Sequence, residues 1–291
     1  MRTAGRRWLA IVPVLLVMLV MTFGTLLFAV AQSLGYAPQY GINHFPTFRY
    51  YQQLFLLPDV MVSLGLTLYY AIVATGLALI LGFLLALALL RVGRHQQWLH
   101  YAYKLPLLVP YLVAIALVIV LFGQGGLIAR LSYALGWIDK PADFANILYN
   151  HYGWGILLVY LWKQVPFMAL SIYVVLLGIP AQTRDAATLL GANRWQRWIH
   201  VVLPQVMPGV LSATLICFAF NVGAFEAPFI LGGGFPDTLP VLAWRLFTDP
   251  DYTQRLTGMA ALVMMGLLLL VSVGLATAVG RRSARRQRGL I

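Results

Sequence analysis

Five residues at helical spacing place polar chemistry inside an apolar stretch of the sequence. They recur at intervals of three and four positions and therefore share one face of a helix: Tyr160, Lys163, Gln164, Phe167 and Ser171. An ionisable group within hydrocarbon costs about 3 kcal/mol, so such a residue is normally functional or paired. A cation beside an amide on this face is suited to holding a small polar solute.

A second apolar stretch carries an amide and a carboxylate. On a continuous helix, one stripe is formed by Phe218, Asn221, Phe225 and Phe229. Glu226 lies roughly 140° from Asn221 if each residue turns the helix by about 100°. We expect both stretches to line a central cavity. The alternative is structural: Lys163 and Glu226 pair across helices or reach a polar interface, and the aromatic rings are packing.

The sequence contains none of the common catalytic patterns. It has no glycine-rich loop ending in Lys and Ser or Thr for nucleotide phosphates, no Gly-x-Ser-x-Gly elbow and no His-Glu-x-x-His pair. Its five histidines are not spaced as metal ligands, and the single Cys217 allows neither an internal disulfide nor a cysteine metal cluster. The sequence therefore predicts a chain that is not an enzyme and binds no cofactor or metal.

The composition indicates which elements must position these residues. Hydrophobic residues fill 61% of the 291 positions and charged residues only 10%, whereas a soluble domain carries about a quarter of its residues as charges. A bilayer core needs about 20 apolar residues of helix. Six stretches qualify: Trp8–Ala31, Met61–Leu90, Leu105–Gly123, Trp154–Leu177, Val206–Leu231 and Leu256–Gly280. The predicted fold class is an all-α polytopic membrane protein with six transmembrane helices.

The charges give the orientation of these spans. Fourteen of the 20 basic residues, with Asp185 as their only acidic neighbour, fall in the N-terminal arm, the second and fourth connections and the C-terminal tail. By the positive-inside rule this side is cytoplasmic, so both termini are expected there. The net charge of +12 then reflects topology, and nucleic acid is not expected as a partner. The first apolar run is longer than a signal-peptide core of about 7 to 15 residues, so we expect a retained anchor.

The cytoplasmic connection between the fourth and fifth spans carries two predicted short helices. Gln182–Leu190 consists of good helix formers, Gly191 interrupts it, and Asn193 is a suitable N-cap for the second helix. The second helix has an apolar stripe made of Trp195, Trp198, Ile199 and Val202. Arg194 and Arg197 lie off that stripe. A helix lying on the lipid and a surface for a protein partner explain this pattern equally well.

One motif in this connection has a distinctive spacing. Its residues are Asp185, Ala186, Ala187, Gly191, Ala192, Trp198, Val201, Leu203 and Pro204. The motif resembles the loop of inner-membrane permeases of binding-protein-dependent ABC importers, which reads Glu-Ala-Ala, three residues, Gly, nine residues, Ile-x-Leu-Pro. All spacings agree, while Asp185 replaces the usual Glu and Val201 the usual Ile. The resemblance extends over roughly Asp59 to Gly280.

The resemblance implies that this segment is a coupling helix, which docks into a groove on a cytoplasmic ATPase. The coupling residues would be Asp185, Ala186, Ala187, Gly191, Ala192, Arg194, Trp198, Leu203 and Pro204. The implied partners are two ABC ATPase subunits that hold ATP and Mg²⁺, a second permease that is a paralogue or another copy, and an extracytoplasmic solute-binding protein. The segment Thr183 to Val202 would move as a lever, with Gly191 setting the angle between its helices.

The sequence leaves the substrate open. The segments Phe225–Phe229, Thr238–Val241 and Asp249–Asp251 resemble the permease subgroup that serves polyamines, thiamine, ferric iron or aminophosphonates. Lys163 favours an anionic solute and Glu226 a cationic one. The alternative function is an ion-coupled secondary transporter. Such proteins usually have two related halves, and this sequence shows no internal repeat and one coupling-type loop.

The expected organisation has three parts. Residues 1–57 hold the N-terminal cytoplasmic arm, the first transmembrane anchor and an external loop. Residues 58–280 form the permease transmembrane domain, with a short amphipathic helix expected around Ile128–Leu135, and residues 281–291 are a basic cytoplasmic tail. The expected location is the cell inner membrane, with all six spans in the lipid bilayer.

Overall fold

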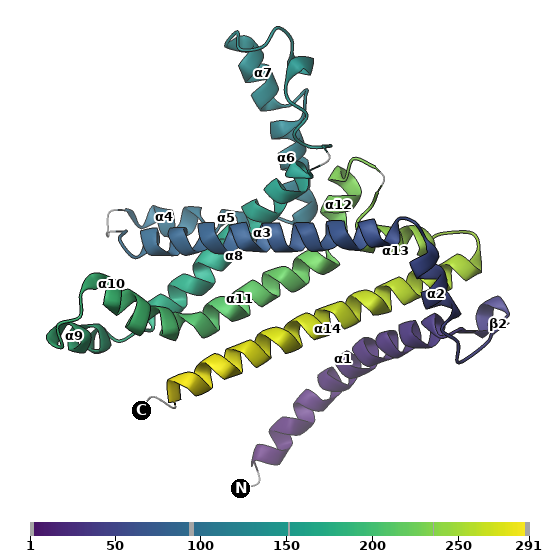
Figure 1. Cartoon of the computed structure of the whole chain (residues 1–291), viewed down its shortest axis with the longest axis horizontal. Coiled ribbons are helices and arrows are strands. Elements are labelled where there is room, and N and C mark those ends of the chain that lie inside the picture. The colour runs from purple at the N-terminus through teal and green to yellow at the C-terminus, as the bar shows by residue number, and fades with distance from the viewer. Residues whose placement is uncertain (1–2, 93–95, 151, 235, 289–291) are drawn as a thin grey trace. The chain divides into compact units, whose positions relative to one another are not determined.

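Six helices in the computed structural model are long and apolar enough to cross a membrane (Figure 1). The structure describes residues 3–92, 96–150, 152–234 and 236–288. Within that part of the chain the candidate spans are Ile11–Ser33, Val60–Leu89, Tyr111–Ala134, Trp154–Leu177, Arg194–Gly223 and Tyr252–Gly274. The prediction of an all-helical membrane protein with six spans is confirmed. The chain divides into two compact units, residues 1–64 with 238–268 and residues 65–237 with 269–291.

The first unit joins long helices to a short hairpin and two small helices. Its elements are α1 (Thr3–Ser33), β1 (Tyr36–Ala37), η1 (Pro38–Tyr40), β2 (Ile42–Asn43), α2 (Arg49–Leu56), the start of α3 (Val60–Leu89), α13 (Leu239–Phe247) and the first half of α14 (Tyr252–Arg288). The strands are antiparallel, with Tyr36 opposite Asn43. The region between the first two spans, expected to be a loop, is folded because Leu54 of α2 is buried in a core with Leu242 and Leu256.

The helix α1 has no buried face along most of its length. Every side chain from Ile11 to Phe28 is exposed within the unit. A helix that is apolar all round is stable when lipid or another membrane helix surrounds it. The exposure of α1 is therefore that of a membrane-embedded helix.

The second unit is built around α8, which packs against α5, α6, α11 and α12. Its elements are the rest of α3, α4 (Trp98–Ala102), α5 (Leu105–Leu108), α6 (Tyr111–Phe122), α7 (Leu127–Ala134), η3 (Pro141–Asp143), α8 (Trp154–Leu177), α9 (Ala181–Leu189), α10 (Arg194–Arg197), η4 (Trp198–Val202), α11 (Leu203–Gly223), α12 (Glu226–Leu231) and the end of α14. A Cβ at Gly82 of α3 would stand 2.6 Å from Cβ of Met168. Glycine at this position thus lets α3 approach α8 closely.

The third span is interrupted near its expected start. The sequence predicts one helix from Leu105 to Gly123, but α5 ends at Leu108 and α6 begins at Tyr111. The ring of Pro110 disfavours helical backbone at the residue before it, and Val109 accordingly has a ψ of 130°. The carbonyls at the end of α5 are left without helical partners, which matters for the site below.

The fifth span is interrupted near its expected end. The prediction of one helix from Val206 to Leu231 is wrong, because α11 ends at Gly223 and α12 begins at Glu226. Pro228 has no amide hydrogen for the carbonyl of Ala224, and its ring would clash with that carbonyl in a helix. Ala224 is extended, with a ψ of 128°. The predicted stripe from Asn221 to Phe229 is therefore not continuous.

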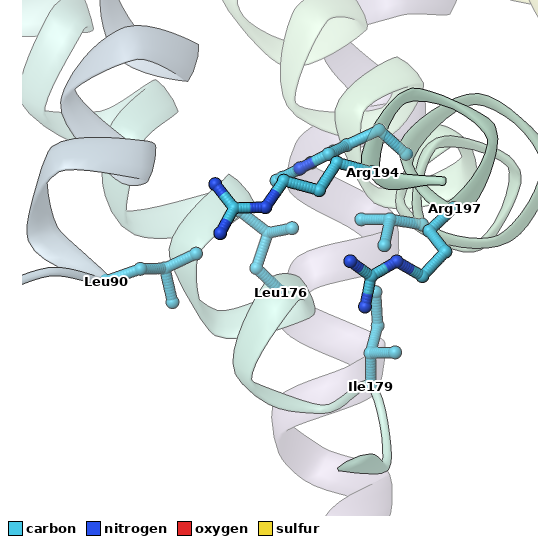
Figure 2. Close-up of a pocket in the computed structure, with 7 residues that line it drawn as sticks. Leu90, Leu176, Ile179, Arg194 and Arg197 are labelled. Atoms are coloured by element: carbon cyan, nitrogen blue, oxygen red, sulfur yellow. The ribbon is translucent and has the colours of Figure 1, made fainter. Parts of the chain in front are cut away.

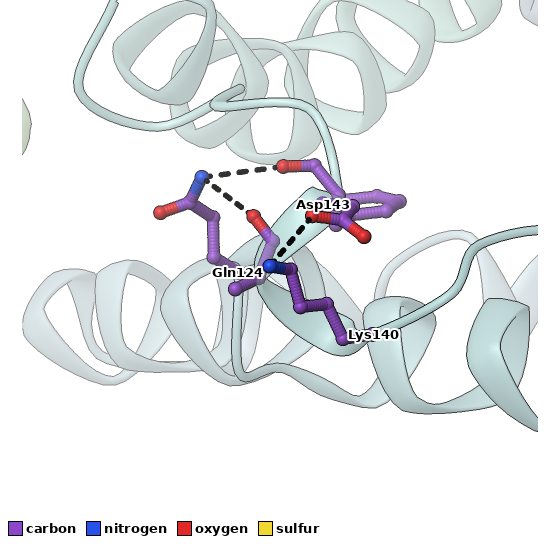
Figure 3. A network of polar contacts seen from close by, with 5 residues as sticks. Gln124, Lys140 and Asp143 are labelled. Carbon is purple, nitrogen blue, oxygen red and sulfur yellow. Dashed lines mark hydrogen bonds and ion pairs between the residues drawn. The ribbon is translucent and has the colours of Figure 1, made fainter.

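The connection between α7 and α8 is held by local polar contacts. The expected amphipathic helix is confirmed as α7. Gln124 lies just before α7, and its Nε2 donates to the carbonyls of Ala142 at 3.5 Å and Phe144 at 3.3 Å, which lie beyond α7 (Figure 3). In the same segment, Nζ of Lys140 lies 3.8 Å from Oδ1 of Asp143. An exposed ion pair of this kind contributes at most about 1 kcal/mol. The two hydrogen bonds from Gln124 to backbone carbonyls therefore hold this connection more specifically than the ion pair does.

Candidate functional site

The segment after α8 ends its first helix in a defined turn. Gly191 adopts the left-handed conformation with a φ of 81°. Its amide donates to the carbonyl of Thr188 at 3.0 Å, and the amide of Ala192 donates to the carbonyl of Ala187 at 3.0 Å. These two bonds form a Schellman motif, which satisfies the last carbonyls of α9. Among the described residues nothing lies within 4 Å of a Cβ built at Gly191. The backbone conformation, and not crowding, requires glycine.

The second short helix starts with a complete capping box. Oδ1 of Asn193 accepts from the amide of Gln196 at 2.8 Å, and Oε1 of Gln196 accepts from the amide of Asn193 at 2.9 Å. The predicted N-cap is confirmed. Nη1 of Arg197 donates to the hydroxyl of Thr188 at 2.8 Å, which links α10 to α9. Hydrogen bonds thus fix the two helices and their turn as one element.

The element continues into the fifth span through a π-helical turn, η4. Pro204 is the second residue of α11 and cannot donate to the turn before it. A wider π turn accommodates this missing donor. Trp198 and Val202 pack with Leu176 and Val206 in a common core. The second helix is therefore a four-residue start to the fifth span, where the sequence predicted a separate helix.

The outer surface of this element is unusually apolar. Leu189 is 89% exposed, Leu190 88% and Trp195 73%. The predicted apolar stripe is divided, with Trp195 outside and Val202 buried. Figure 1 shows α9 and α10 beyond the ends of α8 and α11, where such a surface is open to a partner. Exposed apolar groups gathered on a short, hydrogen-bonded element indicate a protein interaction surface.

The individual motif residues occupy three environments. Asp185 and Ala186 are exposed on α9, and Ala187 is nearly buried. Leu203 and Pro204 are partly buried at the start of α11. The motif therefore runs from an exposed helix, through a turn, to a partly buried start of the fifth span.

The predicted polar face of α8 is brought together with α11 by an amide pair. Nδ2 of Asn221 donates to Oε1 of Gln164 at 3.1 Å, and Nε2 of Gln164 donates to Oδ1 of Asn221. Nδ2 of Asn221 also donates to the hydroxyl of Thr75 on α3 at 3.0 Å. Asn221 is 2% exposed and Gln164 6%. This network joins three helices and occupies polar groups that were expected to face a solute.

Lys163 lies at the interrupted third span. Its Nζ donates to the carbonyls of Pro106 and Val109, each at 2.7 Å. These carbonyls lie where Pro110 ends α5, so the ammonium replaces the missing helical donors. Lys163 and Glu226, both within the described residues, form no ion pair. The partners of Lys163 are therefore backbone carbonyls, where the sequence predicted a solute, the carboxylate of Glu226 or a polar interface.

Two tyrosines form a further polar feature in the core of this unit. The rings of Tyr111 and Tyr160 lie 6.5 Å apart. Both hydroxyls are buried and have no hydrogen-bond partner among the described residues. Glu226 is exposed at the start of α12, and α12 packs against both α6 and α8, the helices that carry the two tyrosines. Two unused donors and one carboxylate thus lie on three helices that contact one another.

The other predicted path residues have mainly packing contacts. The hydroxyl of Ser171 donates to the carbonyl of Phe167 at 2.9 Å, one turn earlier in α8. Phe167 is partly buried against the core that contains Met168. Phe225 stacks on Phe229 with ring centroids 4.9 Å apart.

The sequence interpretation missed Thr75 and Tyr111. A signal for Thr75 was present, because small residues recur along α3 at intervals of three or four and are buried: Thr67, Ala71, Thr75, Ala78, Gly82 and Ala86. Such a stripe marks a helix contact in a membrane protein. Tyr111 stands directly after Pro110, at the start of a helix whose break was not predicted.

Comparison with known proteins places this arrangement in one family. Residues 78–286 match the family described as "Binding-protein-dependent transport system inner membrane component". The chain is 29% identical over 232 residues to the molybdenum transport system permease protein ModB of Mycobacterium tuberculosis, covering 78% of this chain and 83% of that protein. It is 28% identical over 218 residues to the sulfate transport system permease protein CysW of Escherichia coli K12, covering 73% of this chain and 71% of that protein.

The fold has solved counterparts. The chain superposes on a chain of a bacterial ABC transporter involved in the import of the acidic polysaccharide alginate, with a TM-score of 0.74, 18% identity and 96% of both chains covered. The two relatives above are named for molybdenum and sulfate. Neither is named for a polyamine, thiamine, iron or aminophosphonate, the substrates expected from the sequence, so the comparisons do not support that subgroup. The chain belongs to the family of inner membrane components of binding-protein-dependent transport systems, as the multi-pass, non-catalytic permease subunit of an ABC importer whose ATPase is a separate chain.

Proposed function

We propose that this permease forms part of the membrane path for a small oxyanion of the molybdate or sulfate type. The proposal rests on two relatives, which align with the chain over about 220 to 230 residues and are named as molybdenum and sulfate permeases. The proposal replaces the polyamine, thiamine, iron or aminophosphonate assignment. Because the chain belongs to a family of binding-protein-dependent transport systems, the alternative function of an ion-coupled secondary transporter is set aside.

The path that we propose runs along the polar cluster of the second unit. Tyr111 and Tyr160 offer two buried hydroxyl donors, and hydrogen bonds to an anionic acceptor are stronger than those between neutral groups. Glu226 opposes stable anion binding at the same place, which suits a path that must release its solute. Gln164, Asn221 and Lys163 hold the helices around this cluster, while Phe167, Ser171 and Phe225 form the adjoining walls.

The coupling segment is the second part of the proposal. The ATPase would bind the exposed surface of α9 and α10, including Asp185, Ala186 and the apolar Leu189, Leu190 and Trp195. Gly191 and Ala192 fix the turn, and Arg194 flanks it. Trp198, Leu203 and Pro204 then transmit movement of this element to α11. ATP and Mg²⁺ bind to the ATPase, and this chain binds no cofactor.

The number of coupling segments determines how many permease chains the importer needs. One chain supplies one such segment, so a second permease, identical or paralogous, is needed to engage two ATPases. The solute-binding protein of the system would deliver the oxyanion from the other side of the membrane. With the coupling segment in the cytoplasm, the expected position of both termini is also cytoplasmic.

The test is transport by the complete complex. The permease would be purified with the ATPase and binding protein that accompany it and reconstituted in proteoliposomes. ATP-dependent uptake of molybdate, sulfate, spermidine and thiamine would then be compared. Uptake of molybdate or sulfate alone is expected; uptake of a cation and of neither oxyanion would overturn the substrate proposal.

The substitution Glu226→Gln tests the same proposal by charge. Removing the carboxylate lowers the electrostatic barrier to an anion, so oxyanion uptake should be maintained or increased. For a cationic substrate, the same change would remove an attractive group and uptake would fall. Glu226→Asp keeps the charge and serves as the matched control.

A further inference from the structure

A pocket at the base of the coupling element combines two arginines with apolar walls. Its volume is about 280 Å³, and it is lined by Leu90, Leu176, Ile179, Arg194, Arg197, Trp198 and Val202. Figure 2 shows the guanidinium groups of Arg194 and Arg197 directed into the same space, beside Leu176 and Ile179. The pocket therefore offers positive charge and a hydrocarbon-like wall to one ligand.

The position of the pocket along the helices indicates the source of that ligand. Leu90 follows the end of α3, Leu176 lies at the end of α8, and Val202 precedes α11. Three spans thus meet the pocket at the end that continues into the coupling segment. At this level of a bilayer the lipid head groups meet the acyl chains, and a ligand with an anionic head and an apolar tail satisfies both parts of the lining.

The hydrogen bonding of Arg197 supports an anionic ligand. Nη1 donates to Thr188, while Nε is buried and has no acceptor among the described residues. A guanidinium normally presents several donors to a carboxylate or phosphate. Among the described residues, no carboxylate oxygen lies within 4.0 Å of the guanidinium of Arg194 or Arg197.

We propose that this pocket binds the head group of an anionic phospholipid from the cytoplasmic leaflet. The two arginines hold the phosphate, and Leu90, Leu176 and Ile179 contact the glycerol backbone and the first acyl carbons. Leu189, Leu190 and Trp195, the exposed surface assigned to the ATPase, do not line the pocket. Lipid binding at this site would stabilise the junction between the coupling element and the fifth span.

The test counts lipids that stay bound to the purified complex. The full importer would be reconstituted in membranes of phosphatidylcholine and phosphatidylglycerol and extracted again, and retained phosphatidylglycerol would be counted by native mass spectrometry. The pocket variant carries Arg194→Gln and Arg197→Gln. The control carries Arg285→Gln and Arg286→Gln in the basic tail, which removes the same charge. We expect the pocket variant to retain roughly tenfold less phosphatidylglycerol than the control.

A second variant separates the pocket from the hydrogen bond of Arg197. Leu90→Trp enlarges a half-exposed wall residue without changing any charge, and it should also reduce retention. Millimolar inorganic phosphate should not displace the lipid. Equal retention in the pocket and tail variants would overturn the proposal, as would displacement by phosphate, which identifies a free-anion site. Retention that appears only after removal of the ATPase would mean that the ATPase occupies the pocket, and would overturn it as well.

Discussion

The guanidinium of Arg197 donates through Nη1 to the hydroxyl of Thr188 at 2.8 Å, across the turn that separates α10 from α9. Together with the Schellman motif at Gly191, this bond leaves the two helices little freedom to move independently. In the proposed mechanism the ATPase moves α9, and α11 follows only if the angle between α9 and α10 is kept. The bond therefore predicts a specific uncoupling variant.

Replacing Thr188 by Val removes the acceptor and keeps the branched shape of the side chain. Hydrogen bonds to charged groups contribute up to about 3 kcal/mol when buried and less on the surface. We expect the ATPase to remain bound while the ATP hydrolysed per solute imported rises several-fold. Both rates would be measured in the same proteoliposomes. Thr188→Ser retains the hydroxyl and should behave as wild type, and an unchanged ratio in the Val variant would refute the role of the bond.

Gly191→Val should separate transport from membrane insertion. A branched residue in the left-handed region costs about 1–2 kcal/mol, and the turn would relax to a different angle. Uptake should fall roughly tenfold or more while the chain still inserts and assembles. Gly136→Val is the matched control, since Gly136 also has a positive φ, 72°, and nothing described within 4 Å of an added Cβ. Equal loss in both variants would mean that strain alone, and not the coupling turn, causes the defect.

Lys163→Met tests whether the lysine is structural. The substitution leaves the carbonyls of Pro106 and Val109 without their donor, at about 1–3 kcal/mol each. The complex should melt several degrees lower in a thermal assay, and uptake should fall because the junction of α5 and α6 loosens. Lys140→Met, which removes an exposed charge, should change neither. A loss of uptake with unchanged melting would instead assign Lys163 to the solute path.

The amide pair of Gln164 and Asn221 should show strong energetic coupling. Replacing one member by Leu leaves a buried amide unsatisfied and is expected to cost about 1–3 kcal/mol, whereas replacing both removes the unsatisfied group. The double variant should therefore be more stable than the sum of the single effects predicts. A double-mutant cycle on thermal stability measures this directly. Additive effects would contradict the hydrogen-bonded arrangement.

Local features of the sequence predicted much of this molecule. The apolar runs located all six spans, and the turn chemistry of Gly191 and Asn193 located the end of α9 and the start of α10. These signals depend on residues within a few positions of one another. The family followed from a motif of the same short range.

Features that depend on distant residues could not be predicted in this way. The partners of Lys163 are carbonyls 54 and 57 positions earlier in the chain, freed by the break at Pro110. The amide pair likewise joins residues 57 positions apart. The break before α12 was different, because Pro228 signals it within one turn, and helical spacing was extended across it in error.

The π-helical turn η4 holds one residue more than an α-helical turn would, because its hydrogen bonds span five positions instead of four. A regular helix that loses a residue turns everything beyond it by about 100°. Deleting His200 should instead close η4 to an α-helical turn, so that α10 and α11 keep nearly the directions they have. Related permeases that differ by one residue at this turn can thus present the same face to their ATPases.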